Sequence, residues 1–265
     1  MEWQRDIEVL TPLFNPGAYQ DTPELRVPSI RGMVRWWFRE LGGSADEEKE
    51  AFGGMNQMGQ RLRGQTNASR LVLRVSNVHA QKASPNPATL PHKEGGQSSR
   101  KAAFSPGATF RLEVFSRFGP LPDPCQRKVI NALEVWLLLG ALGFRANRSG
   151  GNIWPANGIA PQTPSAFRAR LGEFGCRWPV MLAGPEAGDS LEQLRAAATD
   201  TVKGTDAVFG YARGRDRLAS SLKFKIVRFD NQLRLIATAR EQQIIDEGRR
   251  CLAGHRSKPE TWKTV

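Results

Sequence analysis

The sequence contains few of the residues on which disulfide frameworks, metal sites and histidine catalysis depend. Only three cysteines and three histidines occur in 265 residues. Cys125, Cys176 and Cys251 are odd in number and far apart, which argues for a reducing compartment. Cys251 and His255 have the spacing of two metal ligands, but no second pair accompanies them. No nucleotide fingerprint, P-loop, Ser-His-Asp set or paired metal carboxylates can be assembled, so we expect neither a metal nor a cofactor.

A long hydrophobic run is also missing. The longest uninterrupted apolar stretch, residues 135–144, is ten residues long and is too short to span a bilayer. The chain opens with Met-Glu-Trp-Gln-Arg-Asp, which has neither the basic nor the apolar part of a leader. We therefore expect a soluble, cytoplasmic protein with no membrane partner.

Acidic residues are too few to balance the basic ones. The net charge is +12 and the pI is about 10.2, and the excess lies in two separate blocks. Residues 53–128 hold 12 basic and 3 acidic side chains, and residues 200–265 hold 14 and 8. Residues 1–52 are the reverse, with 6 basic and 10 acidic side chains. Such a distribution, made mostly of arginine, suits a polyanionic ligand.

The hydrophobic pattern predicts an α+β fold made of two units. Period-two segments predict strands, and period-3.6 segments between capping and glycine signals predict helices. The strands are expected at 6–14, 69–78, 109–118, 152–154, 221–229 and 232–239. The helices are expected at 29–42, 124–143, 191–201 and 241–252.

An internal echo suggests that one unit has been duplicated. Residues 68–75 read ASRLVLRV and residues 219–226 read ASSLKFKI, and each copy follows a Phe-Gly pair. We divide the chain into residues 1–155, with a polar insertion at 81–107, and residues 156–265. The insertion is rich in Pro, Ser, Gly and Lys/Arg, so we expect it to be mobile and to order only in a larger assembly.

Residues 24–39, ELRVPSIRGMVRWWFR, are the most informative stretch. With Ser29 at the N-cap, the segment forms a helix that stops near the glycine pair at residues 42 and 43. One side of this helix is a stripe that we expect to face the core. The stripe consists of Ile30, Met33, Val34, Trp37, Phe38 and Leu41.

The opposite side of this helix carries Arg31, Arg35 and Arg39, with Gly32 and Trp36 between them. Like charges four residues apart repel, so the stripe costs helix stability unless an anion lies against it. Guanidinium forks match phosphate oxygens, Trp36 could stack on a base, and Gly32 would let a backbone approach closely. A nucleic acid fits all three features. The alternative interpretation is a solvated helix face.

A second candidate site is the loop after the second helix, where Arg145 and Arg148 precede Ser149, Gly150 and Gly151. Glycines permit backbone amides to converge on an oxyanion, and two arginines add charge-assisted hydrogen bonds. An ordinary helix-to-strand turn remains the alternative, because such turns also favour glycine.

These segments together resemble the RAMP superfamily of CRISPR effector proteins. The resemblance rests on a strand ending Thr-Pro-Leu-Phe at 11–14, on residues 24–39, and on the Phe-Gly pair at 52–53. Within the superfamily, the Ser-Ile-Arg-Gly-x-x-Arg-Trp-Trp signature is most similar to subunit one of the type III-B Cmr complex. Residues 145–151 resemble the superfamily's glycine-rich loop, and residues 217–223 resemble a strand of that subunit's second half.

The resemblance implies two ferredoxin-like (RRM-like) units packed together. It implies a non-catalytic, RNA-binding subunit that holds the 3′ region of a crRNA, helps to capture complementary target RNA, and contacts other CRISPR effector subunits. The RNA-binding candidates lie on the arginine helix and on the glycine-rich loop. They are Ser29, Arg31, Gly32, Arg35, Trp36, Arg39, Arg145, Arg148, Ser149, Gly150 and Gly151.

The main alternative is a RAMP endoribonuclease. Relatives that process CRISPR transcripts often use a histidine, and His92 lies in the polar insertion, where it would be poorly held. Target-cleaving backbone subunits carry an aspartate in the loop after the first strand, where this chain has Asp21. A cap or turn residue ahead of Glu24 is the plainer interpretation of Asp21.

Overall fold

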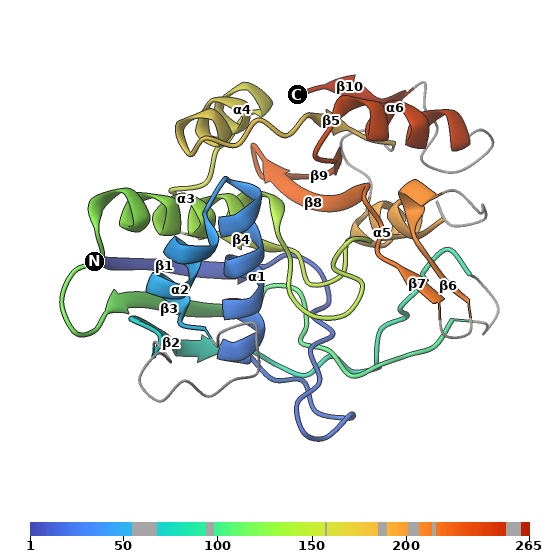
Figure 1. Cartoon of the computed structure of the whole chain (residues 1–265). Helices are drawn as coiled ribbons and strands as arrows, with labels where there is room; N and C mark the ends of the chain where they lie inside the picture. The colour runs from blue at the N-terminus through green and yellow to red at the C-terminus, as the bar shows by residue number, and fades with distance from the viewer. Residues whose placement is uncertain are drawn as a thin grey trace.

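The computed structural model describes residues 1–54, 68–93, 98–156, 158–184, 190–200, 207–213, 216–252 and 261–265. Its helices and strands form two α+β units that lie against each other (Figure 1). The segment that contains α4 (Pro164–Glu173) connects β4 (Ile153–Pro155) of the first unit to β5 (Val180–Leu182) of the second.

The first unit has a βαββαβ order with one additional helix. Its elements are β1 (Glu2–Val9), α1 (Val27–Glu40), α2 (Ala45–Phe52), β2 (Leu71–His79), β3 (Thr109–Ser116), α3 (Asp123–Leu139) and β4 (Ile153–Pro155). The strands form an antiparallel sheet in the order β2-β3-β1-β4. This arrangement is ferredoxin-like.

The second unit repeats that topology. Its elements are β5 (Val180–Leu182), α5 (Leu191–Thr199), a 3-10 helix η1 (Ala207–Phe209), β6 (Tyr211–Arg213), β7 (Asp216–Leu218), β8 (Lys223–Phe229), β9 (Gln232–Thr238), α6 (Gln242–Cys251) and β10 (Lys263–Thr264). The sheet order is β10-β5-β9-β8, and β6 and β7 form a separate hairpin. With that hairpin set aside, both sheets place their fourth, first, third and second strands side by side. The expected α+β fold with two ferredoxin-like units is confirmed, whereas the domain boundary at residue 155 stays a prediction.

The echoed sequence segments are built in the same way in both units. Ser69 Oγ donates to the carbonyl of Ala51 at 3.4 Å, and Ser220 Oγ donates to the carbonyl of Val208 at 3.0 Å. Each acceptor residue directly precedes a Phe-Gly pair. Each serine hydroxyl also donates to the carbonyl two residues further along the chain, that of Leu71 or Leu222. A shared pair of side-chain bonds at matching sequence positions supports duplication of one unit.

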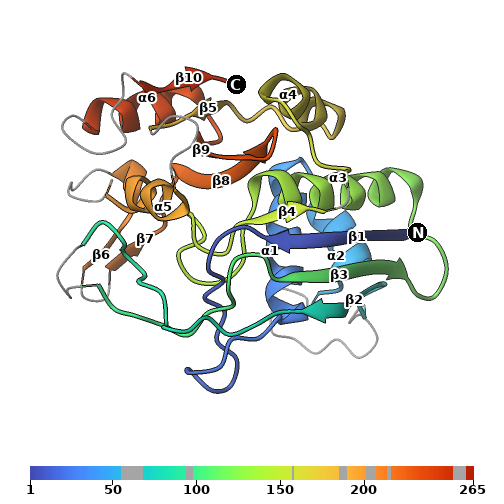
Figure 2. The ribbon, with the colours of Figure 1, turned by 180° about the vertical axis from the view of Figure 1, so that it is seen from behind.

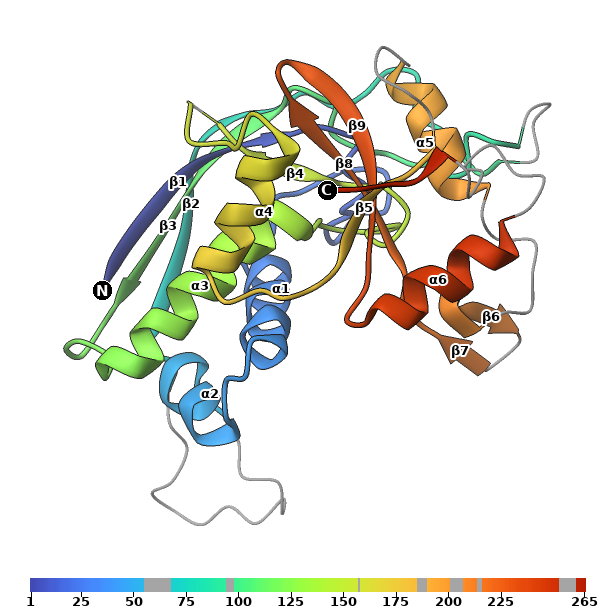
Figure 3. The same cartoon turned by 90° about the horizontal axis from the view of Figure 1, so that it is seen from above.

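Helices cover only one face of the first sheet. Seen from above, α1 and α3 lie on the same side of β1, β2 and β3 (Figure 3). Seen from behind, the strands pass in front of α1, and no helix crosses them (Figure 2). Inward residues such as Ile7, Leu112 and Val114 are buried with the apolar sides of both helices in one core. No helix of the described part of the chain lies on the other face of this sheet, which we call its open face (Figure 2).

The second unit lays one face of its sheet on the first unit. Phe224 and Ile226 of β8 pack with α5 and α6, whereas Val227 and Phe229 belong to the core of the first unit. Lys225 lies on the sheet face that packs against the first unit. It is 1% exposed and donates from Nζ to the carbonyl of Leu137 at 2.7 Å. Because that carbonyl is in the last turn of α3, Lys225 caps this helix. Burial lowers the pKa of Lys225 well below its ordinary value.

The largest differences from the expected element boundaries are in β1 and α3. β1 covers residues 2–9 where the pattern predicted a strand at 6–14, because Pro12 cannot donate to a ladder. Residues 10–14 instead run as buried irregular chain. α3 ends at Leu139 where residue 143 was expected, and the peptide leaves the helix at Gly140 in an extended conformation. A side chain at Gly140 would lie 2.4 Å from Trp136, so this residue is required for the exit.

The insertion at 81–107 is more tightly packed than we expected. Its two arms pair at isolated bridges between Lys82 and Phe104 and between Ala88 and Arg100. Thr89 and Ala103 are buried, at 1% and 0% exposed. The Ala88 carbonyl accepts a 2.7 Å hydrogen bond from Arg195 of α5. The described residues of this segment therefore pack against the fold, because small side chains in the arms allow close pairing. That the segment is mobile and orders only in a larger assembly stays a prediction.

Candidate functional site

The arginine-bearing helix α1 begins two residues earlier than expected. Arg26 is the N-cap and makes no side-chain capping bond, and Pro28 occupies the first turn. The fixed φ of proline suits this position. Ser29 is therefore not the N-cap but lies within the first turn, where its backbone amide donates to the Arg26 carbonyl at 3.0 Å. The expected stop near the two glycines is confirmed, because the helix ends at Glu40.

The apolar side of α1 is the expected one. Ile30, Val34, Trp37 and Phe38 are all 1% exposed or less. Met33 and Leu41 are partly buried against the same core. The buried stripe fixes the rotation of the helix and so determines which side chains face outward.

Arg31 is largely engaged by the backbone of its own unit. Its Nη2 donates to the Leu71 carbonyl at 2.8 Å, and Nη1 donates to the Phe52 carbonyl at 3.5 Å. Burial, followed by repulsion from Arg35 and Arg117, lowers the pKa of the Arg31 guanidinium. Arg31 thus ties α1 to the end of α2 and the start of β2.

Glu48 of α2 supplies part of the anion that the arginine stripe requires. It is 8% exposed and accepts from Arg35 at 2.8 Å (Nε) and 2.5 Å (Nη2). Arg39 Nε lies 3.7 Å from the other carboxylate oxygen. The helix that carries Glu48 was missed by our sequence reasoning. Its signal is the capping box of Ser44 and Glu47, which the structure forms in full.

Gly32 leaves a gap in the outward side of α1. It is exposed, and a Cβ added there would meet nothing within 4 Å. Arg35 and Trp36 lie three and four residues further on, so they flank this gap on the helix surface. Glycine inside a helix costs about 1 kcal/mol relative to alanine, and no contact within the described chain requires it here.

Trp36 and Trp37 join the two units through a cluster of three indoles. Trp36 makes edge contacts with Trp37 and with Trp178, with ring centroids 4.8 and 5.7 Å apart. The Lys223 ammonium lies 4.7 Å from the Trp36 ring and donates to Asn147 Oδ1 at 2.9 Å. Burial lowers the pKa of Lys223 to about 8. Trp36 is therefore half-buried by contacts within the chain. Because two of these contacts come from the second unit, the sequence around Trp36 could not predict them.

The glycine-rich loop uses its amides internally. The four backbone amides at 148–151 donate to carbonyls of the chain, which are, in order, those of Arg145, Phe224, Arg145 and Pro12 at 2.8, 3.1, 3.0 and 2.9 Å. Gly151 has φ +58, and a Cβ there would lie 2.0 Å from the Leu142 carbonyl oxygen. The amides that we expected to converge on an oxyanion instead hold the loop against its surroundings. Gly150 and Gly151 are both buried.

The two arginines of this loop have different environments. Arg148 is 6% exposed and donates from Nη2 to the Phe209 carbonyl at 2.8 Å. Burial lowers the pKa of Arg148 to about 9, so it remains charged at neutral pH. Arg145 is half-buried, and its guanidinium lies 5.0 Å from the ring of exposed Phe144. Arg148 connects the two units, whereas Arg145 lies at the surface. Ser149, the residue after Arg148, is fully buried.

The residues considered for catalysis, Asp21 and His92, each lie within hydrogen-bond distance of a threonine hydroxyl. Asp21 is exposed in the loop between β1 and α1, and its carboxylate accepts from the neighbouring Thr22 hydroxyl at 3.1 Å. His92 Nδ1 lies 3.0 Å from Thr199 Oγ1 of α5. Within the described ranges, no group of three His, Cys, Asp or Glu residues could hold a metal. His255 lies outside the described residues.

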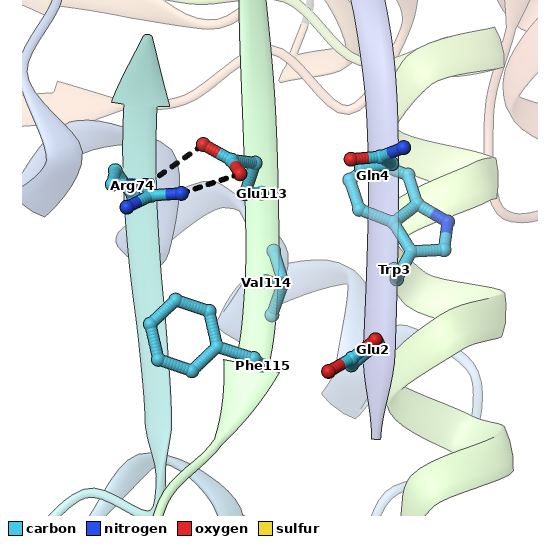
Figure 4. Close-up of a pocket in the computed structure, with 7 residues that line it drawn as sticks. All are labelled: Glu2, Trp3, Gln4, Arg74, Glu113, Val114 and Phe115. Carbon is cyan, nitrogen blue, oxygen red and sulfur yellow. Dashed lines mark hydrogen bonds and ion pairs between the residues drawn. The ribbon is translucent and has the colours of Figure 1, made fainter.

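The charged side chains on the open face of the first sheet pair with one another. A hollow of about 470 Å³ lies there between β1, β3 and β2 (Figure 4). Arg74 and then Ser76 lower the pKa of Glu113 to about 2. Acids and bases pair along this face and its edge, at 2.6–2.7 Å for Arg74–Glu113, Arg111–Asp6 and Arg228–Glu8. Because its charges cancel, this face is a poorer candidate for a polyanion than α1.

None of the described helices is both long and apolar enough to cross a membrane.

Comparison with known proteins gives matches along most of the chain. The model of the RAMP superfamily matches residues 6–154. The CRISPR system Cmr subunit Cmr1-2 of Pyrococcus furiosus is 28% identical over 56% of this chain and 91% of its own length. The Cmr1-1 subunit of the same organism is 28% identical over 56% of this chain, and the match spans 43% of that longer protein.

Solved structures show the same fold. The crystal structure of Cmr1 from Pyrococcus furiosus in its apo form has a TM-score of 0.57 and 19% identity, and the match covers 90% of this chain and 87% of that one. A chain in a cryo-EM structure of the type III-B Cmr-beta complex bound to cognate target RNA has a TM-score of 0.59 and 10% identity, over 89% and 93% of the two chains.

Proposed function

The chain belongs to the RAMP superfamily, and from this membership we propose that it is a non-catalytic RNA-binding subunit of a type III CRISPR effector ribonucleoprotein. In this role it holds the 3′ region of a crRNA, helps to capture complementary target RNA, and assembles with other effector subunits in the cytoplasm. Similarity to Cmr subunits and to a chain of a complex bound to target RNA supports the proposal.

The observation that carries the proposal is the unbalanced charge on the outward side of α1. Arg35 and Arg39 share the Glu48 carboxylate, whereas Arg31 bonds backbone carbonyls, so among the described residues these three guanidinium groups have one carboxylate partner. Two positive charges therefore remain beside the gap at Gly32, where a ligand backbone can approach the helix. A phosphate backbone satisfies both the charge and the space.

We divide the candidate residues into two groups by the contacts that they make within the chain. Gly32, Arg35, Arg39 and Arg145 reach the surface, and we propose that they contact RNA. The others hold that surface in place from within or beside it. They are Ser29, Arg31, Trp36, Arg148, Ser149, Gly150 and Gly151.

We expect Arg39→Glu to weaken binding of single-stranded RNA at least about tenfold at low salt, because a charge-assisted phosphate contact becomes a repulsion. Arg39 is a better probe than Arg35, since Arg35 makes two hydrogen bonds to Glu48 whereas Arg39 only approaches it at 3.7 Å, so replacing Arg39 disturbs the fold less. Fluorescence anisotropy with labelled oligoribonucleotides across a salt series measures the effect. Affinity should fall steeply with salt and vary little among unrelated sequences.

The matched control is Arg250→Glu, which makes the same charge change at an exposed position of α6. It should reduce affinity far less than Arg39→Glu. Equal losses in both variants would mean that only net charge matters and would overturn the α1 site. RNA that is cut during the assay, with cutting lost in Asp21→Asn, would replace the proposal with the endoribonuclease alternative.

Gly32→Ala should change stability and RNA affinity in opposite directions. The free energy of unfolding should rise by up to about 1 kcal/mol, because alanine favours the helix and its Cβ has open space. RNA affinity should fall, since the new methyl group lies where a phosphate backbone approaches. Urea denaturation and anisotropy on the same preparation measure the two effects.

Gly172→Ala separates these effects. Gly172 is also exposed in a helix, α4, and a Cβ there would also meet nothing within 4 Å. We expect a stability gain at this position without a loss of RNA affinity. If Gly32→Ala also leaves RNA affinity unchanged, close approach of RNA at Gly32 is wrong.

A further inference from the structure

An exposed aromatic side chain on the loop that follows α3 lies close to two cations. Phe144 is 45% exposed. The Arg145 guanidinium lies 5.0 Å from the centre of its ring, and the Lys101 ammonium lies 5.6 Å from it. Lys101 comes from the insertion between β2 and β3, so two segments distant in sequence build this cluster.

The two cations differ from the arginines that form ion pairs, because no described carboxylate pairs with either of them. Within the described part of the chain, neither the Lys101 ammonium nor the Arg145 guanidinium has a hydrogen-bond or ion-pair partner, and Arg145 Nε is buried without an acceptor. By contrast, Arg35, Arg74 and Arg228 are each held by a carboxylate. The cluster is therefore a site of unbalanced positive charge.

The backbone presents Phe144 rigidly. Its amide donates to the Phe14 carbonyl at 2.7 Å, and Arg145 adopts φ +64. Gly143 precedes it at φ +76, and a Cβ there would lie 2.3 Å from the same carbonyl oxygen. A non-glycine residue in the left-handed region costs free energy and persists only where the surroundings impose it. The turn thus holds the ring outward, although burying the ring would be favourable.

We propose that Phe144, Lys101 and Arg145 form a stacking site for one unpaired nucleobase and its phosphate. The base lies on the Phe144 ring after the flexible Lys101 side chain moves aside, and the two cations then bind the adjoining phosphate. An acidic peptide would satisfy the cations but would leave the ring exposed, so a nucleotide fits better. The inference rests on the proposed RNA binding and adds an aromatic contact outside α1.

The same loop connects this cluster to the arginine helix. Three residues after Phe144, Asn147 accepts from Lys223, whose ammonium lies over Trp36 of α1. The loop that carries Phe144 is therefore linked to Trp36 of α1 through Lys223.

The test uses the full chain and a single-stranded oligoribonucleotide that contains one 2-aminopurine. In the wild type, stacking should quench the fluorescence of the probe base. Phe144→Ala should abolish the quenching and reduce affinity by about 5- to 150-fold, the range of one lost base stack. Phe144→Trp should preserve both. Because Phe144 is exposed, circular dichroism should show that both variants remain folded.

Phe118→Ala is the matched control. Phe118 is 77% exposed and lies on a different loop. Like Phe144, it is adjacent in sequence to an arginine that lies near its ring, here Arg117, whose guanidinium is 4.9 Å from the ring centre. Its loss should leave quenching and affinity unchanged. If Phe144→Ala behaves like this control while Arg39→Glu still weakens binding, the stacking site is wrong and RNA binding stands. If the wild-type chain does not bind RNA, both the site and the proposed function fail.

Discussion

Trp37→Ala should lower the free energy of unfolding by about 3–5 kcal/mol, the usual cost of removing a large aromatic from a core. Trp37 is 1% exposed. Its ring centroid lies 4.8 Å from that of Trp36 and 4.9 Å from that of Trp178. Truncation therefore removes contacts within the first unit and contacts to the second. Urea denaturation followed by circular dichroism measures the loss.

Trp37→Phe is the informative companion variant. The indole Nε1 of Trp37 is buried and has no acceptor among the described residues. Phenylalanine keeps much of the apolar contact and removes this unpaired donor, so its cost should be much smaller than that of alanine. A loss from Trp37→Ala no larger than that from Trp37→Phe would show that the indole cluster contributes little to the joining of the units.

The parts of this fold that the sequence predicts well are those set by local spacing. The buried stripe of α1 follows from residues three and four apart, and the hairpin of β8 and β9 follows from the Asp230-Asn231 turn. Both turn residues have positive φ, at 46° and 61°, as a tight two-residue hairpin requires. The pairing order of the strands came only through the family resemblance, because long-range pairing has no local signal.

The partners of the candidate site could not be predicted for the same reason. The repulsion within the arginine stripe correctly indicated a nearby anion, but spacing alone could not show that α2 supplies part of it through Glu48. The outward tryptophan was expected to be free for a base. Lys223, from the second unit, lies on it instead. Each contact joins segments far apart in the chain, so it follows from tertiary packing.

The glycine-rich loop shows a further limit of sequence reasoning. Glycine is used both where a ligand must approach the backbone and where the chain needs a positive φ or a tight contact. The pattern of residues 145–151 does not distinguish these uses. The structure does, because the amides at 148–151 are bonded internally and Gly151 lies against the Leu142 carbonyl.

Gly151→Ala is accordingly expected to lower the free energy of unfolding by about 2–5 kcal/mol. About 1–2 kcal/mol comes from placing a side chain at φ +58, and the remainder comes from overlap of the new Cβ with packed neighbours. The Cβ would lie 2.0 Å from the Leu142 carbonyl oxygen and 2.8 Å from Leu13 Cδ1, and neither can move without shifting buried chain. Urea denaturation again measures the change.

Gly158→Ala isolates the conformational part of this effect. Gly158 has φ +74, but a Cβ there would meet nothing within 4 Å. It should therefore cost only about 1–2 kcal/mol, and the difference between the two variants gives the cost of the overlap. RNA affinity distinguishes the roles of the loop. If Gly151→Ala leaves stability intact but abolishes RNA binding, then the loop glycines admit a ligand, and the internal packing seen here is not their main role.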